Sequence, residues 1–386
     1  MPEESLEAIS ELFGESGDIE IDFGDLAKHN LIGVADGPIT VTAGKMVSLQ
    51  TGSSVDPGSD SGPGFGAGAD AQIGHEVNTT YVETLSDIEE ELDSEPLSAY
   101  LASSALSDIT VTANDGNVEL HAFGNFSDTQ IGSQVANESI TQDEDNFDRS
   151  DIGSFGVAEG AINVTAVGSV SLIAGQSFAD LGDFDTRGYL ADSQIGHETS
   201  VFDAHDGSID FDNAGALAAY AGGLIFVAAR DDVTATSVAS ESETQIGHEA
   251  SNRASDERLL GVAEDLYKNL NVETYADGDI KIVAVTGNAE LHVVPESYYS
   301  QSQFGHEVTG YENLVDSIGG GGDGGRGEAT GHIFVVAGSD IRLINEGAEM
   351  AEVHIGHGSL RGFYYEKLEG DIVTIAGKDY VMEGAG

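Results

Sequence analysis

Histidine and glutamate recur side by side in a short motif, Ile-Gly-His-Glu. The complete motif stands at 73–76, 195–198 and 246–249, and variants stand at 131–134, 304–307 and 355–358. Gln precedes the first five copies. If the copies stack at the ~4.8 Å spacing of paired strands, their imidazole and carboxylate groups could chelate a divalent metal. The candidate metal ligands are His75, Glu76, His197, Glu198, His248, Glu249, His306, Glu307 and His357.

The same ladder also has a structural interpretation. Each His would hydrogen-bond the backbone of its turn and stack on the next ring, while each Glu would face water. Short motifs that are repeated once per structural unit are usually of this structural kind. The sequence leaves both interpretations open.

Calcium is the other cofactor that the sequence brings into consideration. Segments 56–70, 143–151 and 180–192 supply the hard oxygen donors that Ca²⁺ prefers, although none has the spacing of a helix-loop-helix calcium loop. The glycine-rich run 319–325 lacks the nonapeptide period of calcium β-rolls. Ca²⁺ is therefore a candidate cofactor, without an assigned site.

Catalytic motifs are missing from the sequence. The chain has no Cys, which excludes thiolate chemistry, disulfides and sulfur-ligated metals. It has no Gly-x-Ser-x-Gly elbow, and its Gly-rich runs lack the Lys-Ser/Thr of a phosphate-binding loop. Only 14 Lys and Arg are present, and none recurs near a fixed pair of acids. We therefore expect that the protein is not an enzyme.

The elements that would position the motif are short strands. A Gly-x-Ile-x-Val-x-Ala pattern with period-2 alternation precedes each copy, beginning at Gly37, Gly160, Gly223, Gly278 and Gly331, with a variant at 109–113. A second apolar triplet such as Val47-Ser48-Leu49 follows 8 or 9 residues after the first Ile. Three short strands joined by tight turns, repeated along the chain, predict one coil of a parallel β-solenoid. Inward Ile, Val, Leu and Ala would then stack from coil to coil.

The expected fold is an all-β solenoid of about 7–8 coils, in which 1–16 is a lead-in and 17–386 is a single domain. The junction from each Ile-Gly-His to the next first strand varies from 17 to 36 residues, which predicts loop or helical insertions at that corner. The alternative is a seven-bladed β-propeller, but such blades need more evenly spaced strands. The predicted insertions are 77–106, 135–159, 199–222, 250–277 and 308–330, with helical character expected within 86–106 and 254–270.

The combined repeat resembles that of the filamentous-haemagglutinin-like exoproteins of bacterial surfaces. Their tandem units read approximately Gly-Asp-Ile-x-Val-x-Ala, then Val-x-Leu, then Ala-Gln-Ile-Gly-His-Gly, and the match extends from about residue 17 to 386. The resemblance implies a right-handed parallel β-helix and an adhesive or structural role. The sequence departs from this pattern in having Glu in place of Gly after His in four copies, and no signal peptide at its start.

Outward positions of the first strand become apolar toward the C-terminus. They are polar in the early coils, as at Thr40 and Thr110, and a strand that is apolar on both faces is normally covered on both. We therefore expect an insertion or another chain to cover these positions. The predicted interface residues are Phe226, Val283, Phe334, Val336, Val373 and Ile375.

The charge of the chain limits its partners. With 69 Asp and Glu against 14 Lys and Arg, the formal net charge is −55, which disfavours nucleic acids and anionic membrane surfaces. No 18-residue apolar stretch predicts a membrane span. We expect a non-enzymatic, extracellular or cell-surface segment that associates with itself, with coils stacking end to end. The alternative is a carbohydrate-binding or polysaccharide-active β-helix, in which Tyr298, Tyr299 and 363–365 would contact a surface glycan.

Overall fold

The structure is a computed structural model, and it describes most of the repeat region of the chain. The described residues are 30–52, 69–84, 99–124, 126–142, 152–177, 186–187, 190–206, 217–255, 272–295, 297–309, 326–347, 350–360 and 365–384.

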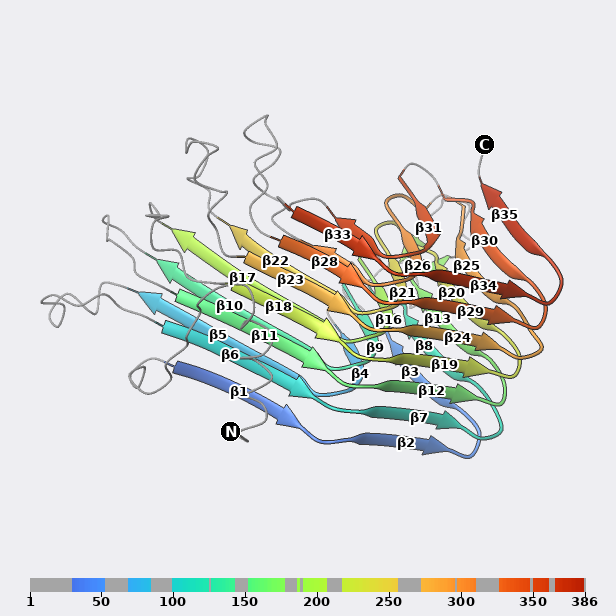
Figure 1. The fold of residues 1–386 in the computed structure, drawn as a ribbon, viewed down its shortest axis with the longest axis horizontal. Coiled ribbons are helices and arrows are strands. Elements are labelled where there is room, and N and C mark those ends of the chain that lie inside the picture. The colour runs from blue at the N-terminus through green and yellow to red at the C-terminus, as the bar shows by residue number, and fades with distance from the viewer. Residues whose placement is uncertain are drawn as a thin grey trace, which may run out of the picture.

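These residues form a parallel β-helix of seven coils (Figure 1). A full coil contributes one strand in turn to each of five sheets, which we name A to E in chain order. Every strand pairs in parallel with its counterpart in the next coil, and the register never slips: Ile109 pairs with Ile39 on one side and with Ile162 on the other. The predicted β-solenoid is therefore confirmed. A propeller is ruled out for the described residues, because its blades would be antiparallel.

Sheets A to C each have seven strands. Sheet A consists of β1 (Asn30–Asp36), β6 (Ala99–Leu106), β11 (Ile152–Glu159), β18 (Leu217–Gly222), β23 (Val272–Asp277), β28 (Arg326–Thr330) and β33 (Tyr365–Glu369). Sheet B consists of β2 (Ile39–Ala43), β7 (Ile109–Ala113), β12 (Ile162–Ala166), β19 (Ile225–Ala229), β24 (Ile280–Ala284), β29 (Ile333–Ala337) and β34 (Ile372–Ala376). Sheet C consists of β3 (Val47–Thr51), β8 (Val118–Ala122), β13 (Val170–Ala174), β20 (Val233–Ser237), β25 (Ala289–Val293), β30 (Ile341–Asn345) and β35 (Tyr380–Gly384).

Sheets D and E each have six strands. Sheet D consists of β4 (Asp70–Ile73), β9 (Asp128–Ile131), β16 (Asp192–Ile195), β21 (Glu243–Ile246), β26 (Gln301–Phe304) and β31 (Glu352–Ile355). Sheet E consists of β5 (Glu76–Thr84), β10 (Gln134–Gln142), β17 (Glu198–Asp206), β22 (Glu249–Ser255), β27 (Glu307–Thr309) and β32 (Gly358–Leu360). A separate antiparallel pair joins β14 (Gln176–Ser177) to β15 (Thr186–Arg187).

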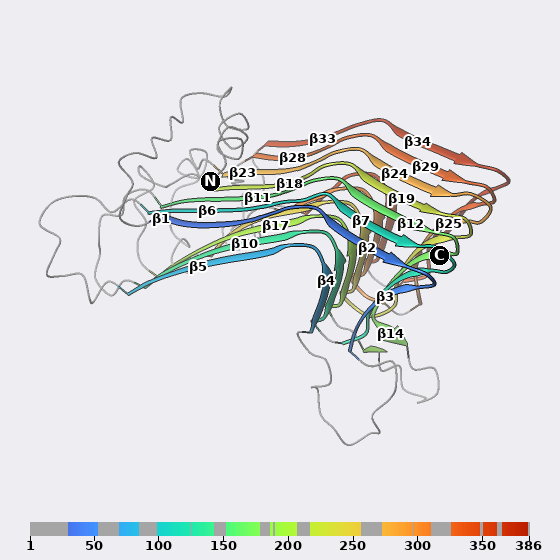
Figure 2. The ribbon, with the colours of Figure 1, turned by 90° about the horizontal axis from the view of Figure 1, so that it is seen from below.

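The main core lies between sheets B, C and D (Figure 2). Period-2 alternation in the sequence sends every second side chain inward, so the strands of sheet B from β7 to β29 show a buried–half-buried alternation. Ile109, Ile162, Ile225 and Ile280 form one buried column at a single register position. Each coil thus covers the apolar face of its neighbour, as in other solenoids.

Sheets A and E pack face to face on the other side of the molecule, and the layer between them is partly polar. Val77, Ala105, Val135 and Ala158 form a small apolar cluster there. Beside it, the Thr79 and Ser103 hydroxyls lie 2.6 Å apart, and Asn137 Nδ2 donates to the Phe155 carbonyl oxygen at 2.8 Å.

The five segments predicted as insertions include strands of sheets A and E, so their predicted bounds are too wide. Each of the five begins with most of a sheet E strand and ends with a sheet A strand, so only the residues between the two strands can be inserted. Residues 99–106, for which a helix was predicted, form strand β6 instead. The helix prediction was wrong because the layer between sheets A and E contains Ser, Thr and Asn side chains. These polar residues weaken the apolar alternation by which a strand is identified in a sequence. Residues 254–255 of the second helical prediction end strand β22, and residues 85–98 and 256–271, where the rest of the helical prediction falls, lie outside the described residues.

Within the described ranges there is no helix, and hence none that is long and apolar enough to cross a membrane.

The outer face of sheet B carries the six predicted interface residues in two columns. One column contains Phe226, Phe334 and Val373, and the other contains Val283, Val336 and Ile375. None of the six is buried, and Val373 and Ile375 are 39% and 55% exposed. Lys281 lies between Phe226 and Phe334, with Nζ 5.9 Å from the centroid of the Phe334 ring. Coverage by a second chain stays a prediction.

Candidate functional site

The Ile-Gly-His-Glu motif forms the corner between sheets D and E. In each copy the first residue, Ile or Phe304, ends a sheet D strand, and the fourth residue begins a sheet E strand. The Gly and the His, or Ser133 in one copy, make the turn between them. Because the strands pair in register, equivalent motif residues form columns that run along the rod.

The imidazoles form a buried stack inside this corner. The rings of His197, His248, His306 and His357 lie parallel, with neighbouring centroids 5.0–5.1 Å apart. The first three of these residues are completely buried.

Both nitrogens of each stacked ring bind the backbone. The backbone N–H of His197 donates to Nδ1 of His248 at 2.9 Å. Since that Nδ1 accepts, the ring proton is on Nε2, which donates to the Gly223 carbonyl oxygen at 2.8 Å. The same pair of bonds recurs at His197 and His306. Burial lowers the pKa of His197 to about 4 and that of His306 to about 3, so the stack is neutral at physiological pH.

A column of glycines precedes the histidines. A Cβ added to Gly196 would overlap the carbonyl oxygen of Gly247, and it would lie 2.6 Å from the carbonyl carbon of the same residue. Gly74, Gly132, Gly247 and Gly305 face the next coil in the same way. The motif therefore requires Gly because the backbones of neighbouring coils approach closely at this turn.

The glutamines that precede the motif form a ladder on the outside of sheet D. Gln72 Nε2 donates to Gln130 Oε1 at 2.8 Å, and the bond repeats from Gln130 to Gln194 and from Gln194 to Gln245 at 2.9 and 2.7 Å. Each of these amides also donates to the carbonyl oxygen of a motif glycine in the next coil, as Gln130 does to Gly196 at 3.1 Å. Every amide thus points in the same direction along the rod.

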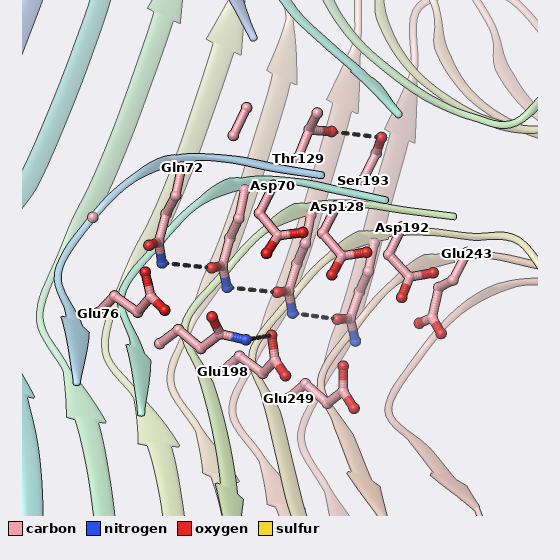
Figure 3. Close-up of a pocket in the computed structure, with 16 residues that line it drawn as sticks. Asp70, Gln72, Glu76, Asp128, Thr129, Asp192, Ser193, Glu198, Glu243 and Glu249 are labelled. Atoms are coloured by element: carbon pink, nitrogen blue, oxygen red, sulfur yellow. Dashed lines mark hydrogen bonds between the residues drawn. The ribbon is translucent and has the colours of Figure 1, made fainter. Parts of the chain in front are cut away.

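Two columns of carboxylates flank the glutamine ladder (Figure 3). The first column begins the sheet D strands, and the second begins the sheet E strands. Their members that line the groove are Asp70, Asp128, Asp192 and Glu243 in the first column, and Glu76, Glu198 and Glu249 in the second. The groove between them has a volume of about 470 Å³, and no Lys, Arg or His lines it.

Burial, and after it the charges of neighbouring carboxylates, raise the pKa values of three acids of the groove. Desolvation in the groove, together with the charges of Glu198 and Asp70, raises the pKa of Asp128 to about 7. Desolvation and neighbouring carboxylates also raise the pKa values of Asp192 and Glu243. The next acid of the second column, Glu307, is 2% exposed, and burial raises its pKa to about 7.

This geometry separates the His and Glu of the predicted metal ladder, and metal binding by these residues stays a prediction. The imidazoles of His197, His248 and His306 are buried at the turn, whereas the carboxylates of Glu76, Glu198 and Glu249 line the groove. The imidazole nitrogens of His197, His248 and His306 are committed to backbone groups, as the structural interpretation expected. Among the residues that the structure describes, no group of three or more His, Asp and Glu is placed to hold a metal ion. Of the predicted calcium segments, 56–68, 143–151 and most of 180–189 lie outside the described residues.

The acidic column of sheet D was missed at the level of sequence. Its signal is an acid two residues before the Gln in four copies, at Asp70, Asp128, Asp192 and Glu243. Only the parallel register shows that these acids face the same groove as the Glu of the motif.

The groove makes stability depend on pH. An acid whose folded pKa is raised contributes stability that is present below its unfolded pKa and is lost as pH rises through the folded value. We expect the wild-type melting temperature to fall between about pH 6 and pH 8, where Asp128 and Glu307 titrate and the buried imidazoles stay neutral. In D192N/E243Q the decrease in melting temperature over this pH range should be smaller than in wild type, and the free energy of unfolding at pH 8 should be higher by about 1–3 kcal/mol.

The matched control is D115N/E383Q, which removes two exposed carboxylates away from the groove. Differential scanning calorimetry at both pH values provides the comparison. An equal gain in stability in the control would assign the effect to net charge instead of the groove.

Comparison of the chain with protein-family models, curated proteins and solved structures finds no match.

Proposed function

We propose that the chain is a non-enzymatic structural and adhesive β-helix segment of a bacterial cell-surface or extracellular filament protein. The observation that carries this proposal is the unbroken register of the coils. Equivalent residues pair from β1 to β33 and from β2 to β34, although the connections between coils differ in length. A rod in which each coil contacts only its neighbours gains length by adding units, which suits a stalk.

End-to-end stacking is the second part of the proposal. At each end of the described rod, the outermost strands pair on one side only: β2 and β3 at one end, β34 and β35 at the other. An unpaired strand edge offers backbone donors and acceptors to another strand. The two ends share one strand pattern, so either a further coil or a second copy would continue sheets B and C there.

The salt dependence of association tests this proposal. The net charge of −55 opposes contact between rods, and the Debye length shortens from about 30 Å at 0.01 M salt to about 8 Å at physiological salt. Sedimentation velocity and negative-stain imaging should therefore show rods that lengthen with protein concentration at physiological salt and dissociate at low salt. A single monomeric species at every concentration and salt would refute self-association.

A second candidate is a carbohydrate-binding or polysaccharide-active β-helix. It is favoured by the side chains of Tyr298 and Tyr299, which are 47% and 57% exposed and offer aromatic faces to sugar rings. The raised pKa of Asp128 beside other carboxylates also fits an acid that donates a proton to a glycosidic oxygen. Glycan-array binding or depolymerisation of a polysaccharide, lost on Y298A/Y299G, would support this candidate over a purely structural role.

A further inference from the structure

The C-terminal end of the described rod is stepped. Sheets A, B and C reach a seventh strand with β33, β34 and β35, whereas sheets D and E stop at their sixth strands, β31 and β32. Within the described part of the chain, β31 and β32 therefore pair on one side only. The last coil lacks its sheet D and sheet E strands, and one strand of each sheet would complete it.

The step uncovers a core position that is buried in the preceding coils. Ile246 and Phe304 end sheet D strands and are at most 1% exposed, but Ile355 at the same register position is only half-buried. A cavity of about 440 Å³ lies against the step and is lined by Glu352, Val353, His354, His357 and Gly358. A further sheet D strand at this place would cover Ile355 and extend the core by one coil.

The turn of the last motif copy also has a backbone donor to offer. In the preceding copies, the N–H of the third motif residue donates to the side chain at the third position of the next coil. The N–H of His248 donates to His306 Nδ1 at 2.9 Å. A hydroxyl can also accept this bond, because the N–H of His75 donates to Ser133 Oγ at 3.3 Å. The described residues include no such turn beyond His357, so its N–H has no such partner among them.

The sequence near the N-terminus contains a further copy of this corner. Residues 20–27 read Glu-Ile-Asp-Phe-Gly-Asp-Leu-Ala, and residues 301–308 read Gln-Ser-Gln-Phe-Gly-His-Glu-Val. Phe23 and Gly24 match the first two motif positions, and Asp25 places an acceptor at the third. An acid begins the segment, as it begins five of the six described sheet D strands. The segment departs from the motif in having Leu in place of the Glu, and it lies outside the described residues.

The place of this segment in the chain also fits a D–E corner. The strands follow one another in the sheet order A to E, so the residues before β1, a sheet A strand, are expected in sheets D and E of a preceding coil. In register, Ile32 of β1 corresponds to Tyr365 of β33. Eight positions separate Gly24 from Ile32, and nine separate Gly356 from Tyr365. The connection is therefore of nearly the same length as one that the rod already contains.

We propose that residues 20–27 of one copy fill the step at the C-terminal end of a second copy. The segment adds one strand to sheet D beside β31 and one to sheet E beside β32. Phe23 covers Ile355 of the neighbouring copy, and the Asp25 carboxylate accepts a charge-assisted hydrogen bond from the N–H of its His357. The coil at the junction is thus built from both chains. The inference rests on the end-to-end stacking proposed above, and it names the segment that makes the junction.

Cysteine cross-linking of the full chain tests the proposal. The chain has no Cys, and in the proposed register Asp22 of one copy stands beside His354 of the other on adjacent parallel strands. The ~4.8 Å spacing of paired strands is within the range of Cα separations that a disulfide spans. A mixture of D22C and H354C proteins is oxidised at physiological salt. We expect a disulfide that joins the two positions, identified by mass spectrometry of the linked peptides.

The control for cross-linking is K378C. Lys378 is exposed at the same end of the rod, in the turn between β34 and β35. Its cross-link to D22C should be at least about tenfold less abundant than that of H354C, because the two positions do not meet the distance that a disulfide requires. If rods lengthen with concentration but D22C links equally to both positions, the proposed junction is overturned while end-to-end stacking stands.

A second pair of variants tests the segment without cysteine. F23D places a charge in the core of the junction, so the concentration needed for rods to lengthen should rise at least about tenfold. F13D makes the same change outside residues 20–27 and should leave rod length as in wild type. Sedimentation velocity at physiological salt compares the two. Equal shortening by both variants would overturn the proposal, and the absence of rods in wild type would overturn the end-to-end stacking as well.

Discussion

Replacement of Gly196 by alanine is expected to destabilise the protein by more than about 4 kcal/mol, beyond the usual range for single substitutions. The added methyl group would overlap the Gly247 carbonyl oxygen and lie 3.2 Å from the His248 backbone nitrogen. These are backbone atoms of the next coil, so no side-chain rotation relieves the overlap. The coils would have to separate at the D–E corner, which would weaken the bond from the Gly247 N–H to the Ile195 carbonyl oxygen.

Chemical denaturation of G196A and of a matched variant, G44A, measures this effect. Gly44 has open space around its added Cβ and no positive φ, so G44A should change stability by less than about 0.5 kcal/mol. If G196A unfolded at the same denaturant concentration as G44A, close approach of the backbones would not explain the glycine column.

Replacement of His248 by alanine is the second change with a large expected effect, about 3–5 kcal/mol of destabilisation. The substitution leaves a cavity between the rings of His197 and His306. It also removes the partners of the buried His197 backbone N–H and of the partly buried Gly223 carbonyl oxygen. Buried polar groups without partners cost about 1–3 kcal/mol each.

The control for H248A is H332A. The His332 side chain is 51% exposed, so this variant should stay within about 0.5 kcal/mol of wild type. Equal destabilisation of the two variants would contradict the structural role of the stack.

The imidazole stack also predicts sensitivity to acid. Its folded pKa values are depressed, so its contribution is present above the unfolded value of about 6.5 and is lost as pH falls toward about 4 at His197 and about 3 at His306. Over the same pH range, the contribution of the groove acids to stability changes in the opposite direction: it grows as pH falls. D192N/E243Q, in which part of that opposing contribution is removed, should therefore lose stability more steeply than wild type between about pH 6 and pH 4, as followed by circular dichroism.

The sequence predicts sheets B and C well and sheets A and E poorly, for a physical reason. In sheets B and C every inward residue faces an apolar core, so strict alternation marks strands such as Ile162–Ala166. Between sheets A and E, buried positions include Ser103, Asn137 and Thr199, whose polar groups bond across the layer or to backbone. Taken one at a time, the sequences of those strands resemble polar loops.

The candidate site was predicted only in part, because sequence spacing places residues in a coil without giving the face that they occupy. The His and Glu of the motif were expected to act together, but the His of the turn is buried and the Glu that begins the sheet E strand lines the groove. The carboxylates that share the groove, such as Asp192 and Glu198, are six residues apart and stand on different strands. Their convergence depends on the concave angle between sheets D and E, which no local pattern encodes.

The two kinds of corner in this rod differ in how freely they can evolve. Between strands of sheets E and A, the connection has 4 residues at 361–364 and 16 at 256–271, yet the register is the same on both sides. Doubling the length of a connection costs only about 0.6 kcal/mol in chain entropy, so sequence can be gained or lost there cheaply. The turn between sheets D and E has no room for an added methyl group at Gly74, Gly132, Gly196, Gly247 or Gly305. Lineages of this protein should therefore diversify at the first corner while the second stays fixed, and a peptide grafted between β5 and β6 should be displayed without disturbing the rod.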